Sequence, residues 1–594
     1  MKSKQNKIKN IGLMGLMGFM GLMQTSCADF LEIKPQNEII LEDFWGEKAD
    51  VDNIVAGCYS AMQTEDMIKR MIIWGEVRSD NIQSGQNINN DADLYNVLKE
   101  TLTAMNKYST WDGFYSVINR CNTVIKYAPG VAEIDPSYTD GDLKATIAEV
   151  SALRDLCYFY LIRTFRNVPY SEEAFTDDDQ KMDLPATPFE TVLDNLIADL
   201  EKVKDDAVNR YPENKDGYQT GRITKDAIYA MLCEMYLWKN DYDNCIKYAE
   251  MVIQSKKDYE EELRNKNGRM AGSSSSLVTI QQRLNGYPLV NDRIQGTRFG
   301  DAYEEIFVDG ASKETIFELA FDRNPQTSSM LANKAISSLY GNTDSRKGLI
   351  TVGSSILGDI KEPSGTLLFE DKDKTNKNDA RLFINADDED EAIIKYAVRS
   401  VTIDASDQNK VDGSPGERFS SDNNGCNWII YRLPDIMLLE AEALVQQMKE
   451  GVDSVTLAEN KPKLDKAFNL VNAINKRAIC KATLTEKDTL KASDYNTKSL
   501  MDGLVKRERQ RELMFEGKRW YDLVRYSMRQ GNTEPVISAV TKRDDVNSQF
   551  AQNFFKKMDA IFWPYNNEEM KVNKSLIPNP VYGSGEDKSY EKTK

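Results

Sequence analysis

The sequence predicts a mainly α-helical protein, in which pairs of antiparallel helices of the tetratricopeptide type carry a loop-rich region with short strands. Three observations lead to this fold class. Apolar residues recur at helical spacing through most of the 594 residues. Residues 223–253 have the residue spacing of a helical hairpin, and residues 254–430 lose the helical period. The chain is too long for one ordinary core, so we expect several folding units or one extended array.

Residues 1–26 have the pattern of a secretory signal. Residues 1–10 contain four lysines and no acid, and the thirteen residues 11–23 are all apolar or glycine. A basic start before a short apolar run is typical of export, and such a run is too short to span a bilayer. The alternative is a buried N-terminal helix, but the glycines in the run disfavour it. Small residues precede Cys27, as at a bacterial lipoprotein cleavage site, so we expect Cys27 to carry the lipid anchor.

Four helices are expected between residues 45 and 200. Their apolar residues fall at spacings of three and four, and Pro129-Gly130 is expected to end the second helix. The fourth helix is expected to start at Pro188, because proline is favoured in the first turn. The three earlier helices are expected over residues 45–63, 111–127 and 142–166.

The stretch 223–253 predicts a hairpin of two helices with a break at residues 239–241. Large residues alternate there with the small residues Cys233 and Cys245 in nearly the spacing of a tetratricopeptide repeat. Small side chains allow two helices to approach closely, so we expect these two cysteines to face each other. Any helical hairpin is the alternative to a true repeat.

Residues 254–430 contain a serine run, many polar residues and interspersed aromatic residues. The aromatic residues indicate a folded region, and long irregular segments of this kind often carry function. Strands are expected over 315–321, 393–398 and 428–431, and helices resume over 433–449 and 465–480.

Composition excludes several classes of function. Lysine and arginine total 76 against 94 acidic residues, and the net charge of −18 argues against nucleic acid as a partner. The chain has no histidine, which excludes Ser-His-Asp and Cys-His catalysis and all histidine-containing metal sites. None of the eight cysteines forms a CxxC pair, so a zinc ribbon is not expected either. We therefore expect no cofactor and no metal.

Residues 508–525 predict two helices separated by Gly517, with charged residues three and four apart. Glu512 and Glu516 have the spacing of a paired-carboxylate hydrolase site. They alternate with Arg509, Arg511, Arg519 and Arg525, which favours an ion-paired structural element over a catalytic pair.

This segment, ERQRELMFEGKRWYDLVR, closely resembles the signature of the SusD/RagB family of surface lipoproteins. Weaker resemblances follow in the family's order. Trp111 to Asn122, Leu153 to Pro169, Arg432 to Ala443 and Ala473 to Ala478 resemble family helices and turns, and Ile577-Pro578-Asn579-Pro580 resembles the closing segment. The resemblance covers essentially residues 27–594. It divides the chain into a signal (1–26), an N-terminal helical region with tetratricopeptide-like pairs (27–253), a loop-rich ligand-binding region (254–430) and a C-terminal helical region with the signature (431–594).

The resemblance implies a fold of four tetratricopeptide-like helix pairs. It also implies a protein that is held on the outer membrane by a lipid, binds an oligosaccharide and delivers it to a SusC-like TonB-dependent transporter, without being an enzyme. A RagB-like peptide-binding lipoprotein is the first alternative. A secreted glycoside hydrolase is the second, and it would need an acid and a base or nucleophile about 5–10 Å apart in a cleft.

Sugar sites present flat aromatic faces and a few polar groups, so aromatic residues in polar stretches are the candidates for ligand binding. Trp74, Asn81 and Tyr95 lie in a polar stretch after the first helices, where the family's binding loops usually occur. Tyr287 and Tyr340 lie in the irregular region. For each of the five, packing in the core or plain exposure is the alternative.

Overall fold

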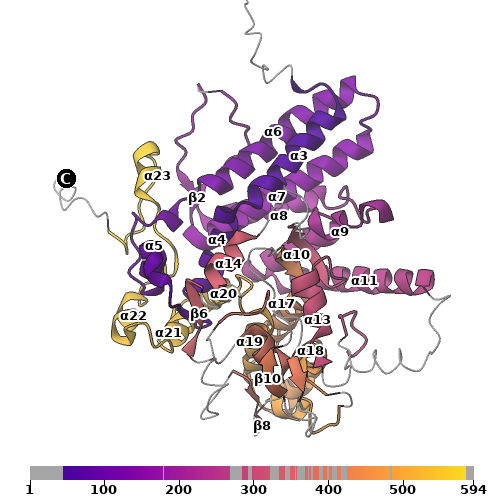
Figure 1. Ribbon diagram of the computed structural model, residues 1–594, viewed down its shortest axis with the longest axis vertical. Coiled ribbons are helices and arrows are strands. Elements are labelled where there is room, and N and C mark those ends of the chain that lie inside the picture. The colour runs from indigo at the N-terminus through magenta and orange to yellow at the C-terminus, as the bar shows by residue number, and fades with distance from the viewer. Residues whose placement is uncertain are drawn as a thin grey trace, which may run out of the picture.

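The computed structural model describes residues 44–583 with gaps at 178, 268–283, 292–297, 322–332, 342–347, 355, 357–367, 372–373, 376–378, 387–391, 398–400, 404–410, 416–424 and 482–483. The signal and Cys27 lie outside these residues. The described chain is mainly helical with few short strands, as the sequence predicts. Figure 1 shows the long N-terminal helices as an upper layer and the orange helices of the C-terminal half below them. In the described ranges we find no helix long and apolar enough to cross a membrane.

Four helices pack side by side in the upper layer, in the order in which they follow along the chain. α7 is covered on both sides, and all of its residues from Ala148 to Phe165 are buried. Pro188 is the N-cap residue of the last of the four, which confirms the predicted start. The four helices are α3 (Lys48–Met62), α6 (Asp112–Ile134), α7 (Asp140–Phe165) and α8 (Phe189–Val203).

The predicted end of the second of these helices at Pro129 is wrong. α6 continues through Pro129 to Ile134. Proline removes one hydrogen bond from the helix, which usually ends or kinks it. Here Ala128 and Val131, on either side of the proline, are both buried. Their packing against the neighbouring helices keeps the chain helical where local chemistry alone would end it.

The predicted hairpin is present as α10 (Lys225–Trp238) and α11 (Tyr242–Asn267). The connection turns at Asn240, whose φ of +62° is left-handed, a conformation that asparagine tolerates. The Sγ atoms of Cys233 and Cys245 lie 3.7 Å apart, and both residues are buried free thiols. The facing of these cysteines is therefore confirmed. α11 runs past residue 253, where the predicted loop-rich region begins, before it ends.

The lower layer continues the same stacking, because α11 packs against α17, which packs against both α18 and α19. The helices predicted over 433–449 and 465–480 are confirmed, although the second begins earlier, at Ser454. The layer contains α17 (Leu433–Gln446), α18 (Ser454–Ala478), α19 (Lys498–Leu513) and α20 (Arg519–Gln530).

Shorter helices fill the space between and beside the layers. They are α4 (Glu65–Ile72) with the π-helix η2 (Ile73–Val77), α5 (Ala92–Leu98), α9 (Tyr218–Gly221), α13 (Asp301–Tyr303), α14 (Lys334–Tyr340), α16 (Ala380–Asn385), α21 (Glu534–Val540), α22 (Ser548–Phe554) and α23 (Asn567–Val572).

The strands form small antiparallel sheets. β5 (Thr315–Leu319) pairs with β11 (Trp428–Arg432), which confirms two of the three predicted strands. The third prediction, over 393–398, is wrong: Ile393 makes one isolated bridge to Ala386, and a turn follows. The other strands are β1 (Ile82–Ser84) with β6 (Ile350–Val352), β2 (Val168–Pro169) with β3 (Ala186–Thr187), β7 (Glu370–Asp371) with β8 (Lys374–Thr375), and β4 (Arg298–Phe299), β9 (Val401–Ile403) and β10 (Val411–Pro415) in one sheet.

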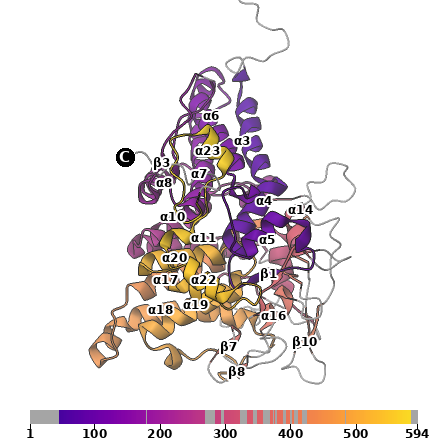
Figure 2. The same cartoon turned by 90° about the vertical axis from the view of Figure 1, so that its left-hand side faces the viewer.

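The chain after α22 returns to the N-terminal helices. The backbone N–H of Trp563 donates to the carbonyl of Thr164 at the end of α7 (2.8 Å), and the hydroxyl of Tyr565 donates to the carbonyl of Asn167 (2.7 Å). The guanidinium of Arg78 donates to the carbonyl of Ala560 (3.1 Å). Figure 2 shows the yellow C-terminal helices alongside the N-terminal ones. The two ends of the described chain therefore share one core.

Candidate functional site

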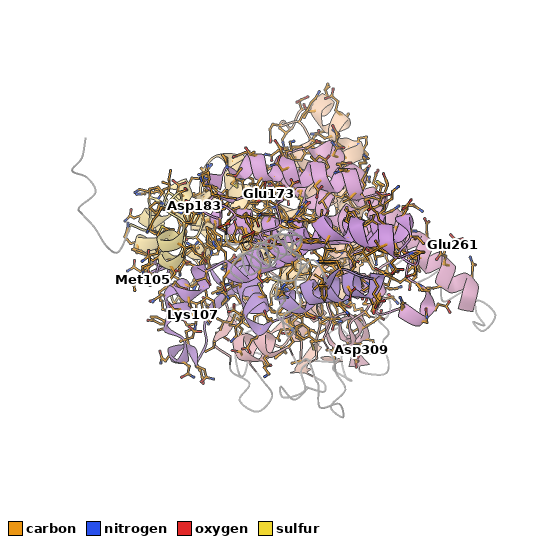
Figure 3. The ribbon with its side chains drawn as sticks, turned by 90° about the horizontal axis from the view of Figure 1, so that it is seen from above. Met105, Lys107, Glu173, Asp183, Glu261 and Asp309 are labelled. Atoms are coloured by element: carbon orange, nitrogen blue, oxygen red, sulfur yellow. The ribbon has the colours of Figure 1, made fainter. Side chains whose placement is uncertain are left out.

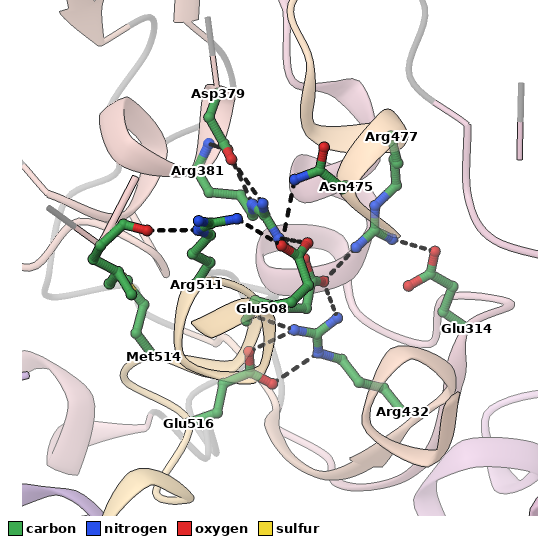
Figure 4. A network of polar contacts seen from close by, with 12 residues as sticks. Glu314, Asp379, Arg381, Arg432, Asn475, Arg477, Glu508, Arg511, Met514 and Glu516 are labelled. Atoms are coloured by element: carbon green, nitrogen blue, oxygen red, sulfur yellow. Dashed lines mark hydrogen bonds and ion pairs between the residues drawn. The ribbon is translucent and has the colours of Figure 1, made fainter. Parts of the chain in front are cut away.

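Ten buried charged side chains form one network around the signature segment (Figure 4). Its members are five carboxylates and five cations, so their formal charges balance. We call this set the signature network. Its carboxylates are Glu314, Asp379, Glu508, Glu512 and Glu516, and its cations are Arg381, Lys395, Arg432, Arg477 and Arg511.

Glu512 lies at the centre of the signature network. It accepts hydrogen bonds from Arg432 (2.6 Å), from Arg381 (3.0 Å) and from Arg477. Burial alone would raise the pKa of Glu512, but these three guanidinium groups lower it well below its usual range. The carboxylate is therefore ionised and fully enclosed.

Glu516, four residues further on and beyond the end of α19, is held in the same way. Arg432 donates to both of its oxygens (2.7 and 2.8 Å), and Lys395 donates to one of them (2.5 Å). Burial opposes ionisation, yet Arg432 and Lys395 lower the pKa of Glu516. A catalytic acid needs a protonated carboxyl group that substrate can reach. The interpretation of this segment as an ion-paired structural element is confirmed.

The predicted ligand residue Trp74 is part of the core. It is 0% exposed, stacks on Phe114 with ring centroids 4.9 Å apart, and donates from its indole N–H to the carbonyl of Tyr108 (2.8 Å). We call residues 514–518, which connect α19 and α20, the signature turn. η2 packs tightly against it, since a Cβ on Gly75 would lie 1.9 Å from the carbonyl oxygen of Gly517. The structure therefore gives Trp74 no face that a sugar ring can reach.

Asn81 is likewise buried and has structural partners. Its amide donates to Glu76 (2.7 Å) and accepts from Gln510 (2.8 Å). Glu76 in turn accepts from the backbone N–H groups of Phe515 (2.9 Å) and Lys518 (3.1 Å). Burial raises the pKa of Glu76. Asn81 thus helps to hold the signature turn, and its amide is not available to a ligand.

The two tyrosines of the irregular region differ in their accessibility. Tyr340 is 2% exposed and donates its hydroxyl to the carbonyl of Phe515 (2.9 Å), so it also supports the signature turn. Tyr287 is half-buried against the lower layer, with Lys257 Nζ 5.3 Å from its ring centroid. Burial raises the pKa of Tyr287 to about 12. Tyr287 keeps part of its surface open.

Tyr95 is the predicted ligand residue that the structure exposes most clearly. It lies on α5 and is 40% exposed. The segment between β1 and α5 is rich in amides, and the side chains of Gln86, Asn87 and Asn89 are exposed. An exposed aromatic ring and several exposed amides within ten residues of one another have the chemistry expected of a sugar site. We call Tyr95 and residues 83–90 the Tyr95 surface.

Asp545, far along the chain, fixes the Tyr95 surface in place. Its carboxylate accepts from the backbone N–H (3.0 Å) and the hydroxyl (2.8 Å) of Ser84. Lys99 donates to the carbonyl of Asp545 (2.6 Å), and its Nζ lies 5.4 Å from the Tyr95 ring centroid. Asp545 had no signal in the sequence, because no motif or period connects it with residues 84–99. These contacts hold residues 84–99 in one conformation before any ligand binds. Binding therefore does not have to supply the free energy of ordering them.

A pocket of about 270 Å³ lies between the end of α7 and the C-terminal residues 559–580. Arg166 and Asp559 form an ion pair there (2.7 Å), and the closing segment 577–580 forms one wall. The sequence indicated this segment only through its likeness to a family motif. Among the described residues, we find no group of three acidic or cysteine side chains placed to hold a metal ion.

The chain matches two family models that together span residues 29–582. The model described as "SusD family" matches residues 237–582, more than half of the chain. The model described as "Starch-binding associating with outer membrane" matches residues 29–237. SusD-like protein P38 of Formosa agariphila is 25% identical over 539 residues, which are 87% of this chain and 92% of that protein.

Solved structures share the fold. A SusD superfamily protein from Bacteroides thetaiotaomicron superposes with a TM-score of 0.58 at 20% identity, over 91% of this chain and 99% of that one. A laminarin-binding SusD-like protein superposes with a TM-score of 0.56 at 17% identity, over 90% and 99% of the two chains.

Proposed function

We propose, from the premise that this chain belongs to the SusD family, that it is a cell-surface lipoprotein that binds an oligosaccharide and passes it to a SusC-like TonB-dependent transporter. Two comparisons support the choice of ligand: the description of the family model over residues 29–237 names starch binding, and one structural neighbour binds laminarin. The same description names association with the outer membrane, which supports the proposed location.

The exposed ring of Tyr95 is the observation that carries the proposed site. A pyranose ring has apolar C–H faces, and an aromatic ring can stack on them while neighbouring amides bind the hydroxyl groups. Gln86 and Asn89, shortly before Tyr95 in the chain, supply exposed amides. Tyr287 is a second candidate for a stacking face, because the residue is only half-buried.

No catalytic residue is proposed. The closely spaced carboxylates of the signature segment are enclosed by arginines, which leaves them no role in bond cleavage. The protein is expected to bind its oligosaccharide in the micromolar to millimolar range, or about −4 to −8 kcal/mol, and to release it unchanged.

Calorimetric titration of the protein with a panel of glycans tests this function. Tyr95→Ala should weaken binding by about 1–3 kcal/mol without changing the unfolding transition. The matched control is Tyr218→Ala: Tyr218 is 43% exposed and has Lys215 Nζ 5.7 Å from its ring centroid, but it lies on α9. Equal affinities of the Tyr95 variant and the unchanged protein would refute the site. Binding of peptides with no affinity for any glycan would favour the RagB-like alternative.

Chromatography of the same mixtures tests the absence of turnover. The glycan should elute unchanged after prolonged incubation with the protein. Steady release of shorter products, abolished by changing a single carboxylate, would support the hydrolase alternative instead.

The lipid anchor is tested separately. Cys27→Ala removes the only thiol at the expected cleavage site, and the variant should be absent from the cell surface. Surface labelling and membrane fractionation measure this. Normal surface display of the variant would contradict the proposed anchor.

A further inference from the structure

Four large apolar side chains are exposed around the short helix α23. Val572 and Ile577 are each 82% exposed, Met105 is 75% exposed, and Met182 is 55% exposed. α23 has no buried residue of its own. Single exposed apolar residues are ordinary, but a group of large ones on one face usually marks an interaction site.

Hydrogen bonds bring these four residues together from three parts of the chain. The amide of Asn566 donates to the carbonyl of Asn106 (3.0 Å), which places Met105 beside the start of α23. The amide of Asn573 donates to the carbonyl of Leu184 (2.7 Å), which places Met182 beside its end. Figure 3 shows Met105 and Asp183 on the same side of the molecule, next to the yellow C-terminal ribbon. We call this group the α23 face.

The pocket of about 270 Å³ adjoins the α23 face. Ile577 lines it, together with Pro185 and Ala186, which directly follow Leu184. Phe165, Phe562 and Tyr565 contribute aromatic surface to its wall. Its volume suits one large side chain of a partner, and such anchor pockets carry much of the energy of protein interfaces.

The charges around the α23 face are uneven. On α23 and just after it, Glu568 and Glu569 are balanced by Lys571 and Lys574. Among the described residues of the loop 172–183, between β2 and β3, Glu172, Glu173, Asp177, Asp179 and Asp183 are exposed carboxylates and Lys181 is an exposed cation. A second cation, Lys126 of α6, donates to Thr176 of this loop (3.3 Å), so the loop stays strongly acidic. An occupant of this face therefore meets a neutral apolar area on one side and a strongly acidic loop on the other.

We infer that the α23 face docks a segment of a partner protein that places an apolar side chain in the pocket and basic residues over the loop 172–183. Charge complementarity selects this occupant. The net charge of −18 opposes both a second copy of this chain and an anionic lipid surface.

Photo-crosslinking in the native cells tests the docking surface. A benzophenone amino acid replaces Val572 or Ile577 in the full chain, and the control position is Val452, which is 75% exposed on the turn before α18. Both test positions should give an adduct with one protein, whose crosslinked segment, identified by mass spectrometry, carries net positive charge. An adduct yield no higher than at Val452, a dimer of this chain, or an adduct with lipid would overturn the inference.

Charge reversal supplies the second arm of the test. The double change Asp179→Lys with Asp183→Lys should lower the adduct yield roughly tenfold, since rim charges mainly set association rates. The matched control is Glu261→Lys with Glu262→Lys, on the far side of the molecule in Figure 3, which should leave the yield unchanged. Equal yields from the two reversed proteins would overturn the inference. Affinity for glycan, measured on the same proteins, should stay unchanged.

Discussion

Glu512→Gln is the sharpest test of the signature network, because glutamine has nearly the same shape as glutamate and removes only the charge. Three guanidinium groups donate to the Glu512 carboxylate, and all of them are buried. In the variant, the five cations of the network face four carboxylates. The amide NH2 also places a donor where the native group only accepts.

The size of the effect follows from these contacts. A hydrogen bond to a charged group contributes about 1.5–3 kcal/mol. Removing one partner of a buried ion pair typically costs about 3–5 kcal/mol, because the remaining charge stays buried without compensation. Glu512 joins three such pairs, so we expect the free energy of unfolding to fall by about 3–5 kcal/mol.

Chemical denaturation followed by circular dichroism measures this loss. The control is Glu459→Gln, which breaks the exposed pair of Lys449 and Glu459 (2.6 Å, side chains 67% and 48% exposed) and should cost less than about 1 kcal/mol. The glycan affinity of the folded Glu512→Gln variant should be unchanged. A Glu512→Gln protein as stable as the unchanged chain would refute the structural role, and loss of a hydrolytic activity with full stability would assign the carboxylate to catalysis.

Three further predictions concern the core. Trp74→Ala should lower the free energy of unfolding by about 3–5 kcal/mol, and calorimetry should find unchanged glycan affinity; weakened binding at full stability would restore Trp74 to the ligand site. Cys233→Leu should overpack the hairpin and cost about 1–3 kcal/mol, whereas Cys233→Ala should cost less in the same denaturation assay; equal stability of the leucine variant would contradict the close contact. Burial favours protonation of Asp435, but Lys518 and Arg509 lower its pKa from 3.8 to about 2. Its stabilising contribution is therefore complete above pH 4 and lost as the pH falls through 2, and Asp435→Asn should flatten that part of a stability-against-pH curve.

Local sequence signals predicted the helices well but not where polar residues would be buried. The stretch around Trp74 and Asn81 is polar enough to suggest an exposed loop. In the structure the polar side chains there are buried against distant partners, such as Gln510 of α19 for Asn81 and Arg519 of α20 for Asp80. Burial of such groups depends on partners more than 400 positions away in the sequence, which no local pattern contains.

The signature segment shows the same limit at the site itself. Its spacing predicted that Glu512 and Glu516 would be ion-paired, and they are. The neighbouring arginines looked like the partners, yet Arg509 binds Asp435 and Asp522, and Arg519 binds Asp80. The cations that hold the two glutamates come from positions 381, 395, 432 and 477. Residue types were sufficient to predict the kind of interaction, and only the fold could supply the pairing.

The residues of the signature network lie far apart in the sequence, so the network can form only after most of the chain has been synthesised. Glu314 is made first and Glu516 last, about 200 residues later, which is roughly 10–40 s at ordinary rates of translation. Until then Arg381, Arg432 and Arg477 have no complete set of counter-charges, so the lower layer cannot close. The chain from Asp559 to Asn573 must follow before the upper layer gains its last partners. A chain that ends before Glu516 therefore keeps uncompensated charges in the lower layer, and we expect it not to form a smaller stable protein.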